Sequence, residues 1–351
     1  MIINLKSETD LSAFYVVYDG SVNIEGVGER GVSHLLEHLV AKAVDHLQDE
    51  YDIDGIEFNA YTSNNEIVFY IKGIDEKIEK RKSEFLKLLG DFNVTKEEFI
   101  NEKNIVLEEY MDAFSEPTEW HQLNLERKIF NNYNPIGSKV DLEKFTYMNC
   151  IDYFKKQYLK PTKIINVSKN SEFESDIDFA ESITEKDYTL EVNNDFELEG
   201  DLSDSSKSSL ILISPIIEED FNVTKIINAM LSQGLNSPLY QEIREKRGLV
   251  YYIHMYTSRM GKRGVVTIST LTSDKNVDKI NGIIKAIFDN PSKFLTKERF
   301  NICVESIKVQ FKKSEILRYN SVGKYINPEE WDLEKDLESI TLDKCLEVFN
   351  K

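Results

Sequence analysis

Hydrophobic positions in the first part of the chain predict strands that alternate with long helices. From Val32 to Leu47, apolar residues recur three and four positions apart, which is the spacing of one heavily buried helix face. The chain opens with short alternating stretches, and residues 12–21 predict a strand that ends in a Gly-Ser turn. The other elements predicted here are two strands around a polar turn at 58–73, helices from 76 to about 130 with breaks near 92–95 and 116–117, a helix over 141–161 and a strand over 162–168.

A similar pattern begins again after a strongly acidic stretch. Residues 171–204 contain thirteen acidic residues and one basic residue, and a serine-rich run follows over 201–209. The elements predicted beyond it are a strand over 209–216, helices over 219–232 and 238–246, strands near 249–258 and 264–271, and long helices from Val277 and from Lys297. Because both halves combine a few strands with long helices, the simplest architecture is α+β, with two similar domains that each have a sheet backed by helices. We place the first domain at 1–175, an interdomain segment at 176–207 and the second domain at 208–351.

Charge and cysteine content exclude several classes of protein. The chain of 351 residues has 43 basic and 62 acidic side chains and a formal net charge of −19, which argues against binding nucleic acid or anionic membranes by bulk electrostatics. Its three cysteines are far apart, which argues against a disulfide framework or a thiolate zinc finger. No apolar run approaches the length of a transmembrane helix, and the first residues do not resemble a signal peptide. We therefore expect a cytoplasmic protein with no nucleic-acid partner and no membrane partner.

The strongest chemical signal is His34-Leu-Leu-Glu37-His38, which lies within the buried helix. Residues four apart share a helix face, so the two imidazoles can converge on one metal ion. A catalytic zinc ion takes three protein ligands and keeps one open position. Glu37 is then close enough to act as a base on water without being a ligand, which is the HxxEH arrangement. The alternative is that His34 and His38 are hydrogen-bonded core histidines.

A third ligand is needed, and the predicted helix NEKNIVLEEYMD offers two candidates. Glu102 and Glu109 are two turns apart and share a face, whereas Glu108 points elsewhere. One carboxylate could bind the metal while the other orients a ligand histidine. The spacing does not decide which is which, and acidic residues on a helix also commonly form a solvated face.

Five segments in order resemble the M16 family of zinc peptidases, which includes pitrilysin, insulin-degrading enzyme and mitochondrial processing peptidase. They are HLLEH, FNAYTSNNEIVFY, NEKNIVLEEY, YNPIGSKVDLEKFTYMNCIDYFKKQY and NSPLYQEIREKRGLVYYI. The resemblance, to the shorter two-domain members, implies a LuxS/M16 metallohydrolase-like α+β fold with mainly antiparallel sheets. It also implies one Zn²⁺ per chain bound by His34, His38 and Glu109, with Glu102 in support and Glu37 as the general base. Asn134 departs from the pattern, since a histidine is often found there.

The resemblance further implies an extended peptide substrate. In the family, the strand pair receives the substrate backbone and an Arg and a Tyr contact the substrate from the opposite domain. The matching residues here are Arg244 and Tyr251, together with the substrate-binding residues Asn59, Ala60, Tyr61, Thr62 and Ser63. We therefore expect a zinc metalloendopeptidase that acts on peptides or unfolded segments, for turnover or for maturation of a peptide.

Shorter family members pair two chains, so the resemblance also implies a homodimer, with an M16-like hetero-partner as the alternative. Two other functions are alternatives to the peptidase. One is a non-catalytic M16-like subunit that acts as a scaffold or docking partner. The other is a small-molecule metallohydrolase, which the predicted peptide-binding residues disfavour.

The Arg/Tyr motif also predicts a local structure by itself. Ser237 can cap a helix that has Pro238 at its first position, and Gly248 can end that helix. Arg244 then lies in the last turn and Tyr251 begins the following strand. A guanidinium and a phenol at such a corner can donate hydrogen bonds to a peptide carbonyl. The alternative is a surface ion pair and a packed tyrosine.

Overall fold

Two compact units make up the chain. The computed structural model describes residues 1–129, 134–183, 208–217, 220–260, 263–316, 319–326 and 333–350, so most of the predicted interdomain segment lies outside the described residues. The first unit comprises 1–111, 133–186 and 314–330, and the second comprises 112–132, 187–313 and 331–351. Each unit has its own sheet and its own helices, as the α+β prediction requires. Each unit is assembled from three separate segments, whereas each predicted domain is one continuous range.

The first unit is built on a five-stranded mixed sheet in the order β1-β5-β2-β4-β3. Its strands are β1 (Ile2–Lys6), β2 (Leu11–Asp19), β3 (Glu57–Thr62), β4 (Glu66–Ile74) and β5 (Lys163–Ser168). β1 and β5 are parallel, and every other neighbouring pair is antiparallel. Among the described residues β3 is therefore an edge strand, with β4 on one side only.

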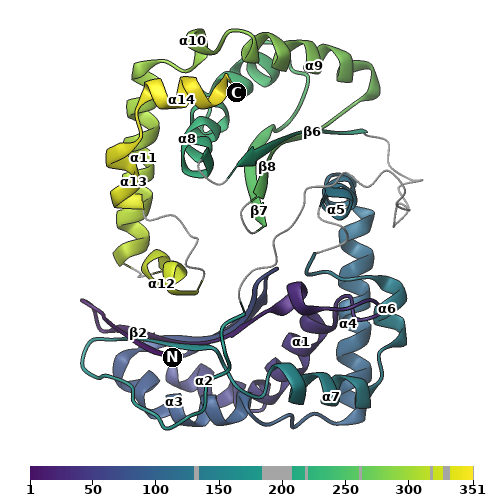
Figure 1. Cartoon of the computed structure of the whole chain (residues 1–351), viewed down its shortest axis with the longest axis vertical. Coiled ribbons are helices and arrows are strands. Elements are labelled where there is room, and N and C mark those ends of the chain that lie inside the picture. The colour runs from purple at the N-terminus through teal and green to yellow at the C-terminus, as the bar shows by residue number, and fades with distance from the viewer. Residues whose placement is uncertain are drawn as a thin grey trace. The chain divides into compact units, whose positions relative to one another are not determined.

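Helices lie on both faces of this sheet (Figure 1). They are α1 (Val32–Asp45), α2 (Gln48–Asp54), α3 (Asp75–Leu89), most of α4 (Lys96–Ser115), α6 (Lys139–Lys144), α7 (Tyr147–Gln157) and α12 (Tyr319–Ile326), with a 3-10 turn η1 (Ser21–Ile24). Phe14 of β2 packs edge-on against Phe85 of α3. The next residue, Tyr15, points to the opposite face and joins a buried cluster that includes Val322 and Ile326 of α12. The alternation of a strand therefore divides the residues of β2 between two helix layers.

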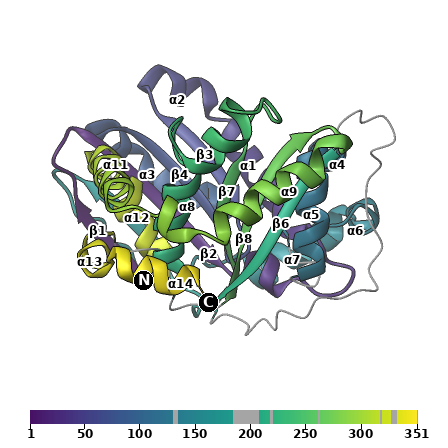
Figure 2. The ribbon, with the colours of Figure 1, turned by 90° about the horizontal axis from the view of Figure 1, so that it is seen from above.

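The second unit has a three-stranded antiparallel sheet in the order β6-β8-β7. Its strands are β6 (Ser208–Ile217), β7 (His254–Met260) and β8 (Arg263–Thr272), and its helices are α5 (Pro117–Ile129), α8 (Phe221–Ser232), the π-helix η3 (Tyr240–Glu245), α9 (Asp274–Phe288), α10 (Pro291–Phe294), most of α11 (Lys297–Ile316), α13 (Leu333–Ser339) and α14 (Leu342–Phe349). Seen from above, α8 and α9 pass in front of the strands (Figure 2). Apolar residues of α8, α9, α11 and α14 form one core cluster with Ile268 of β8.

Most predicted elements are confirmed within a few residues of their ends. The buried helix predicted from Val32 is α1, and the predicted breaks separate α3, α4 and α5. The single helix predicted over 141–161 is wrong, because the chain is extended at Phe145 and Thr146 and forms two helices, α6 and α7; the Thr146 hydroxyl accepts the N–H of Asn149 and so caps the second. One strand prediction is wrong in part, because the strand placed near 249–258 begins only at His254. The segment before His254 is hydrogen-bonded to side chains of β8 and not to its main chain: the Thr272 hydroxyl donates to the Leu249 carbonyl at 2.9 Å, and the Thr270 hydroxyl donates to the Tyr252 carbonyl. Tyr251 therefore precedes the strand and does not begin it.

Two exclusions drawn from composition can be compared with the structure. Cys150, Cys303 and Cys345 are all buried and free, so none of them forms a disulfide. In the part of the chain that the structure describes, no helix combines the length and the apolar character needed to cross a membrane.

Candidate metal centre

Helix α1 presents His34 and His38 on one face, and their ring centroids are 4.9 Å apart. Helix α4 brings the carboxylate of Glu109 to both of them. Its Oε2 atom lies 3.5 Å from Nε2 of His34 and 3.6 Å from Nε2 of His38. One potential ligand atom from each of these three residues lies within 4.8 Å of the other two, and they are the one such group found among the described residues.

These distances fit a shared metal ion better than they fit hydrogen bonds. Hydrogen bonds between nitrogen and oxygen have a preferred length of about 2.9–3.0 Å, which is shorter than the 3.5 and 3.6 Å observed here. Ligands at about 2.0–2.1 Å from zinc in a tetrahedral site lie about 3.3 Å from each other. Two imidazoles and one carboxylate are also the donor types of a catalytic zinc site, so the residues present fit zinc.

Glu102, the other predicted candidate on α4, lies at the far nitrogen of His38. Its Oε2 atom is 3.5 Å from Nδ1 of His38, and its Oε1 atom is 3.5 Å from Nζ of Lys42. The rotation of α4 about its axis therefore places Glu109 beside the Nε2 atoms of both histidines and places Glu102 beside the Nδ1 atom of His38. A carboxylate in that position can accept the Nδ1–H of His38 and fix the tautomer in which Nε2 carries the free lone pair. The Lys42 contact was not predicted from the sequence.

Burial favours the neutral form of the first histidine. Removal from water lowers the pKa of His34 to about 4, and the neighbouring His38 acts in the same direction. The imidazole of His34 is therefore neutral at pH 7, which is the form that binds a metal. Its Nδ1 atom is buried, and none of the described residues makes a hydrogen bond to it.

Glu37 is held by a contact that the sequence pattern did not reveal. The hydroxyl of Thr62, at the end of β3, donates a hydrogen bond of 2.7 Å to Oε2 of Glu37. Burial raises the pKa of Glu37, while the Thr62 hydrogen bond and His38 lower it and Glu109 raises it. Strand alternation could have provided the signal, because Thr62 shares with Phe58 the face of β3 that is turned to the helices.

The predicted substrate-binding residues follow the edge strand. Asn59, Ala60, Tyr61 and Thr62 lie on β3, and the side chain of Tyr61 is exposed. Ser63 lies beyond the strand, where its hydroxyl accepts the N–H groups of the next turn, two and three residues on, at 3.1 Å. Ser63 therefore shapes the turn, while β3 itself offers the edge at which another strand could pair.

The predicted pair Arg244 and Tyr251 lies in the second unit, and the structure brings these two residues together. The guanidinium carbon of Arg244 is 5.2 Å from the ring centroid of Tyr251 and 4.5 Å from that of Tyr240, which are cation–π distances. Tyr251 is 81% exposed. The predicted end of the helix is confirmed, since Gly248 has φ 61° and donates to the Arg244 carbonyl. The predicted cap is wrong, because the Ser237 hydroxyl is buried without a hydrogen bond.

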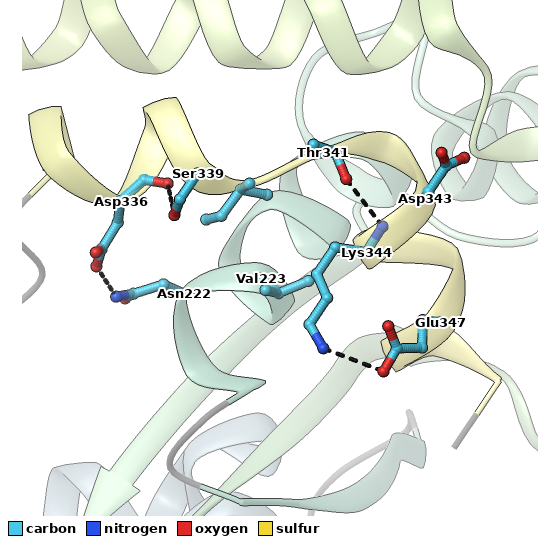
Figure 3. A pocket seen from close by; sticks show the side chains of 9 residues that line it. Asn222, Val223, Asp336, Ser339, Thr341, Asp343, Lys344 and Glu347 are labelled. Atoms are coloured by element: carbon cyan, nitrogen blue, oxygen red, sulfur yellow. Dashed lines mark hydrogen bonds and ion pairs between the residues drawn. The ribbon is translucent and has the colours of Figure 1, made fainter.

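A polar hollow of about 540 Å³ also occurs in the second unit (Figure 3). Three of its charged groups, those of Asp336, Lys344 and Glu347, have partners within it. Asn222 donates to Asp336, and Nζ of Lys344 donates to Glu347 at 3.1 Å. Among the described residues that line it there is no histidine and no cysteine, so it differs in its donor groups from the cluster on α1 and α4.

A histidine pair on one buried helix that faces a carboxylate from a second helix, beside a mixed sheet, is the donor arrangement of a metallohydrolase. Two family models match the sequence around it. Residues 3–139 match the model described as insulinase, peptidase family M16, and residues 159–306 match the model described as the peptidase M16 inactive domain. The chain belongs to the M16 family, as its motifs predicted.

Similar proteins support the same family. An uncharacterized zinc protease of Rickettsia bellii is 26% identical over 369 residues, which cover 94% of this chain and 89% of that protein. A probable mitochondrial-processing peptidase subunit beta of Arabidopsis thaliana is 22% identical over 172 residues, which cover 46% of this chain and 32% of that protein. The crystal structure of a protease from Helicobacter pylori has a TM-score of 0.79 at 17% identity, covering 99% of this chain and 93% of that one, which confirms the predicted fold.

Proposed function

We propose that this protein is a zinc-dependent endopeptidase with one Zn²⁺ per chain, bound by His34, His38 and Glu109. The observation that carries the proposal is the convergence of these three side chains, with ligand atoms within 4.8 Å of one another. A zinc ion bound there supplies a Lewis acid, which polarises a peptide carbonyl and lowers the pKa of a water molecule. The names of the relatives, which are zinc proteases, support both the metal and the reaction.

Glu37 is the general base in this proposal. It is the neighbour of His38 in the chain, and its carboxylate accepts a hydrogen bond from Thr62. Burial raises its pKa above the usual value, which suits a group that must take a proton from water and pass it to the leaving amine. The Thr62 hydroxyl orients Oε2, so the other carboxylate oxygen remains for the water.

The substrate is a peptide or an unfolded segment that pairs as an added strand with the edge of β3. Main-chain hydrogen bonds to those residues of the 59–63 region whose N–H and C=O groups point away from β4 hold its backbone, since no described strand occupies that edge. The same strand carries Thr62, which contacts Glu37, so a peptide paired there lies next to the proposed base.

The assembly proposed is a homodimer in which Arg244 and Tyr251 of each chain complete the metal centre of the other. Two-fold symmetry makes this exchange reciprocal. The stack of Arg244 between Tyr240 and the exposed Tyr251 supports a role in contacting a partner or a substrate. An M16-like hetero-partner is the alternative, which the name of the Arabidopsis relative, a subunit beta, supports.

A second candidate function is a non-catalytic subunit that acts as a scaffold. The match of residues 159–306 to a model described as an inactive domain favours it, whereas the complete donor set on α1 and α4 favours the peptidase.

The test is cleavage of a mixed peptide library, read by mass spectrometry, with chelator and after zinc is restored. The peptidase predicts new termini that disappear with chelator and return with zinc. A zinc-loaded protein, assayed as a dimer, that yields no cleavage would favour the scaffold.

A further inference from the structure

Helix α1, which carries the two proposed histidine ligands, is preceded by Gly31, which has no side chain to cap the helix. Gly31 has φ 93°, and a Cβ atom there would lie 3.0 Å from the Cα atom of Gly137. Both the backbone conformation and the close approach therefore require glycine. The first N–H groups of a helix have no partner within the helix, and a Ser, Thr, Asp or Asn at this position normally provides one. In α1 the acceptor must come from elsewhere.

Glu25 supplies that acceptor from six residues upstream. Its Oε2 atom accepts the N–H of Gly31 at 2.9 Å, and its Oε1 atom accepts the N–H of Ser33 at 2.8 Å. The residue is only 2% exposed. Burial raises the pKa of Glu25 to about 7, while the two N–H groups and Arg30 act in the opposite direction. A buried carboxylate is destabilising unless it is hydrogen-bonded, and here both oxygens accept a bond.

We propose that Glu25 is a positioning residue of the metal centre, and this inference rests on the proposed zinc site. Its carboxylate fixes the backbone of Ser33, which directly precedes His34. The turn that carries His34 is thereby held in the geometry that brings its Nε2 atom within 3.5 Å of Glu109. Without this cap the first turn of α1 frays and His34 is displaced, while His38, one turn further on, keeps its place.

The test is zinc affinity, measured by competition with a chelating dye. Glu25→Gln should weaken zinc binding about tenfold, the lower end of the effect of residues that support metal ligands. The amide keeps one acceptor but sets an NH₂ group against the second backbone N–H, so one of the two bonds is lost. Amide hydrogen exchange of the zinc-free protein should become faster at Gly31 and Ser33, and remain unchanged in the last turn of α1.

Two control variants separate positioning from charge and from general stability. Glu29→Gln removes a carboxylate of the same loop that accepts the N–H of Gly26 and not a helix amide, so zinc affinity should stay at the wild-type value. Val44→Ala opens a cavity at a fully buried position near the end of α1. It should lower the melting temperature without changing zinc affinity.

The outcomes distinguish this inference from the proposed function. If the wild type binds no zinc, the proposed function fails. If the wild type binds zinc and Glu25→Gln binds it as tightly as Glu29→Gln does, the positioning role of Glu25 is wrong and the function stands. Should Glu25→Gln not fold, Glu25→Asp decides, since its carboxylate is withdrawn by one carbon atom. A folded Asp variant with wild-type zinc affinity would then overturn the inference.

Discussion

Replacing Thr62 by valine should impair catalysis while leaving the metal in place. The change keeps the shape of the side chain but removes the hydroxyl, which donates a hydrogen bond of 2.7 Å to Oε2 of Glu37. Valine is also well suited to a strand, so β3 should be preserved. The hydroxyl of Thr62 is hydrogen-bonded to Glu37, which is not one of the three proposed ligands, so zinc content should stay at about one ion per chain.

The expected size of the effect follows from the hydrogen bond. A bond to a charged group is worth about 1.5–3 kcal/mol, and each 1.36 kcal/mol changes a rate about tenfold. If the bond orients Glu37 for proton transfer, kcat/KM should fall about 10- to 150-fold, and the loss should appear mainly in kcat. The assay is hydrolysis of a defined peptide found in the library screen, with bound zinc measured on the same samples.

Thr62→Ser is the matched control. It retains the hydroxyl and the backbone that would pair with substrate, so its activity should remain close to that of the wild type. Equal losses in Thr62→Ser and Thr62→Val would count against the hydrogen bond to Glu37 as the cause, because the serine variant keeps the hydroxyl that donates it. Wild-type kcat/KM in a zinc-loaded Thr62→Val protein would refute the reasoning outright.

Three further predictions concern ligation, stability and assembly. Glu109→Gln should lower zinc affinity more than Glu102→Gln, for which a loss of about 10–100-fold is expected; the reverse ranking in a chelator titration would mean that the two carboxylates exchange roles. Ile326→Ala should destabilise the unit that carries the metal centre by about 2–5 kcal/mol, because Ile326 is buried against its sheet; an unchanged urea midpoint would contradict this. Mixing Glu37→Gln and Arg244→Ala homodimers should restore activity in up to about a quarter of the sites, since half the dimers are mixed and one of their two sites is intact. No recovery despite subunit exchange would place Arg244 in its own chain's site, or in none.

The position and the buried face of a single helix or strand could be predicted from the sequence, because side chains return to the same face every few residues. The apolar spacing after Val32 identified α1 and its buried face, and the same spacing placed His34 and His38 together. The candidate acids on α4 were also found, but their spacing could not decide between Glu102 and Glu109. That choice depends on how α4 is turned against α1, and helix packing is a property of the whole unit.

Contacts between segments far apart in the chain could not be predicted from these local sequence patterns. Thr62 and Glu37 meet because β3 ends above α1, and nothing in either local pattern specifies that meeting. Glu25 looks like one more surface acid in a chain rich in them, and only its burial beneath Gly31 reveals the cap. The contribution of α12 to the first unit was missed for the same reason, since its residues follow the sheet of the second unit in the chain.

The most direct test of the account is a parallel measurement of bound zinc and peptide hydrolysis in the wild type and in Glu37→Gln. The account predicts about one zinc per chain in both proteins. It also predicts that hydrolysis falls at least ~100-fold in the variant, because a general base contributes about that much or more. Loss of zinc from Glu37→Gln would show that Glu37 is a ligand, and undiminished hydrolysis would show that it is not the base. Either result would contradict the proposed centre.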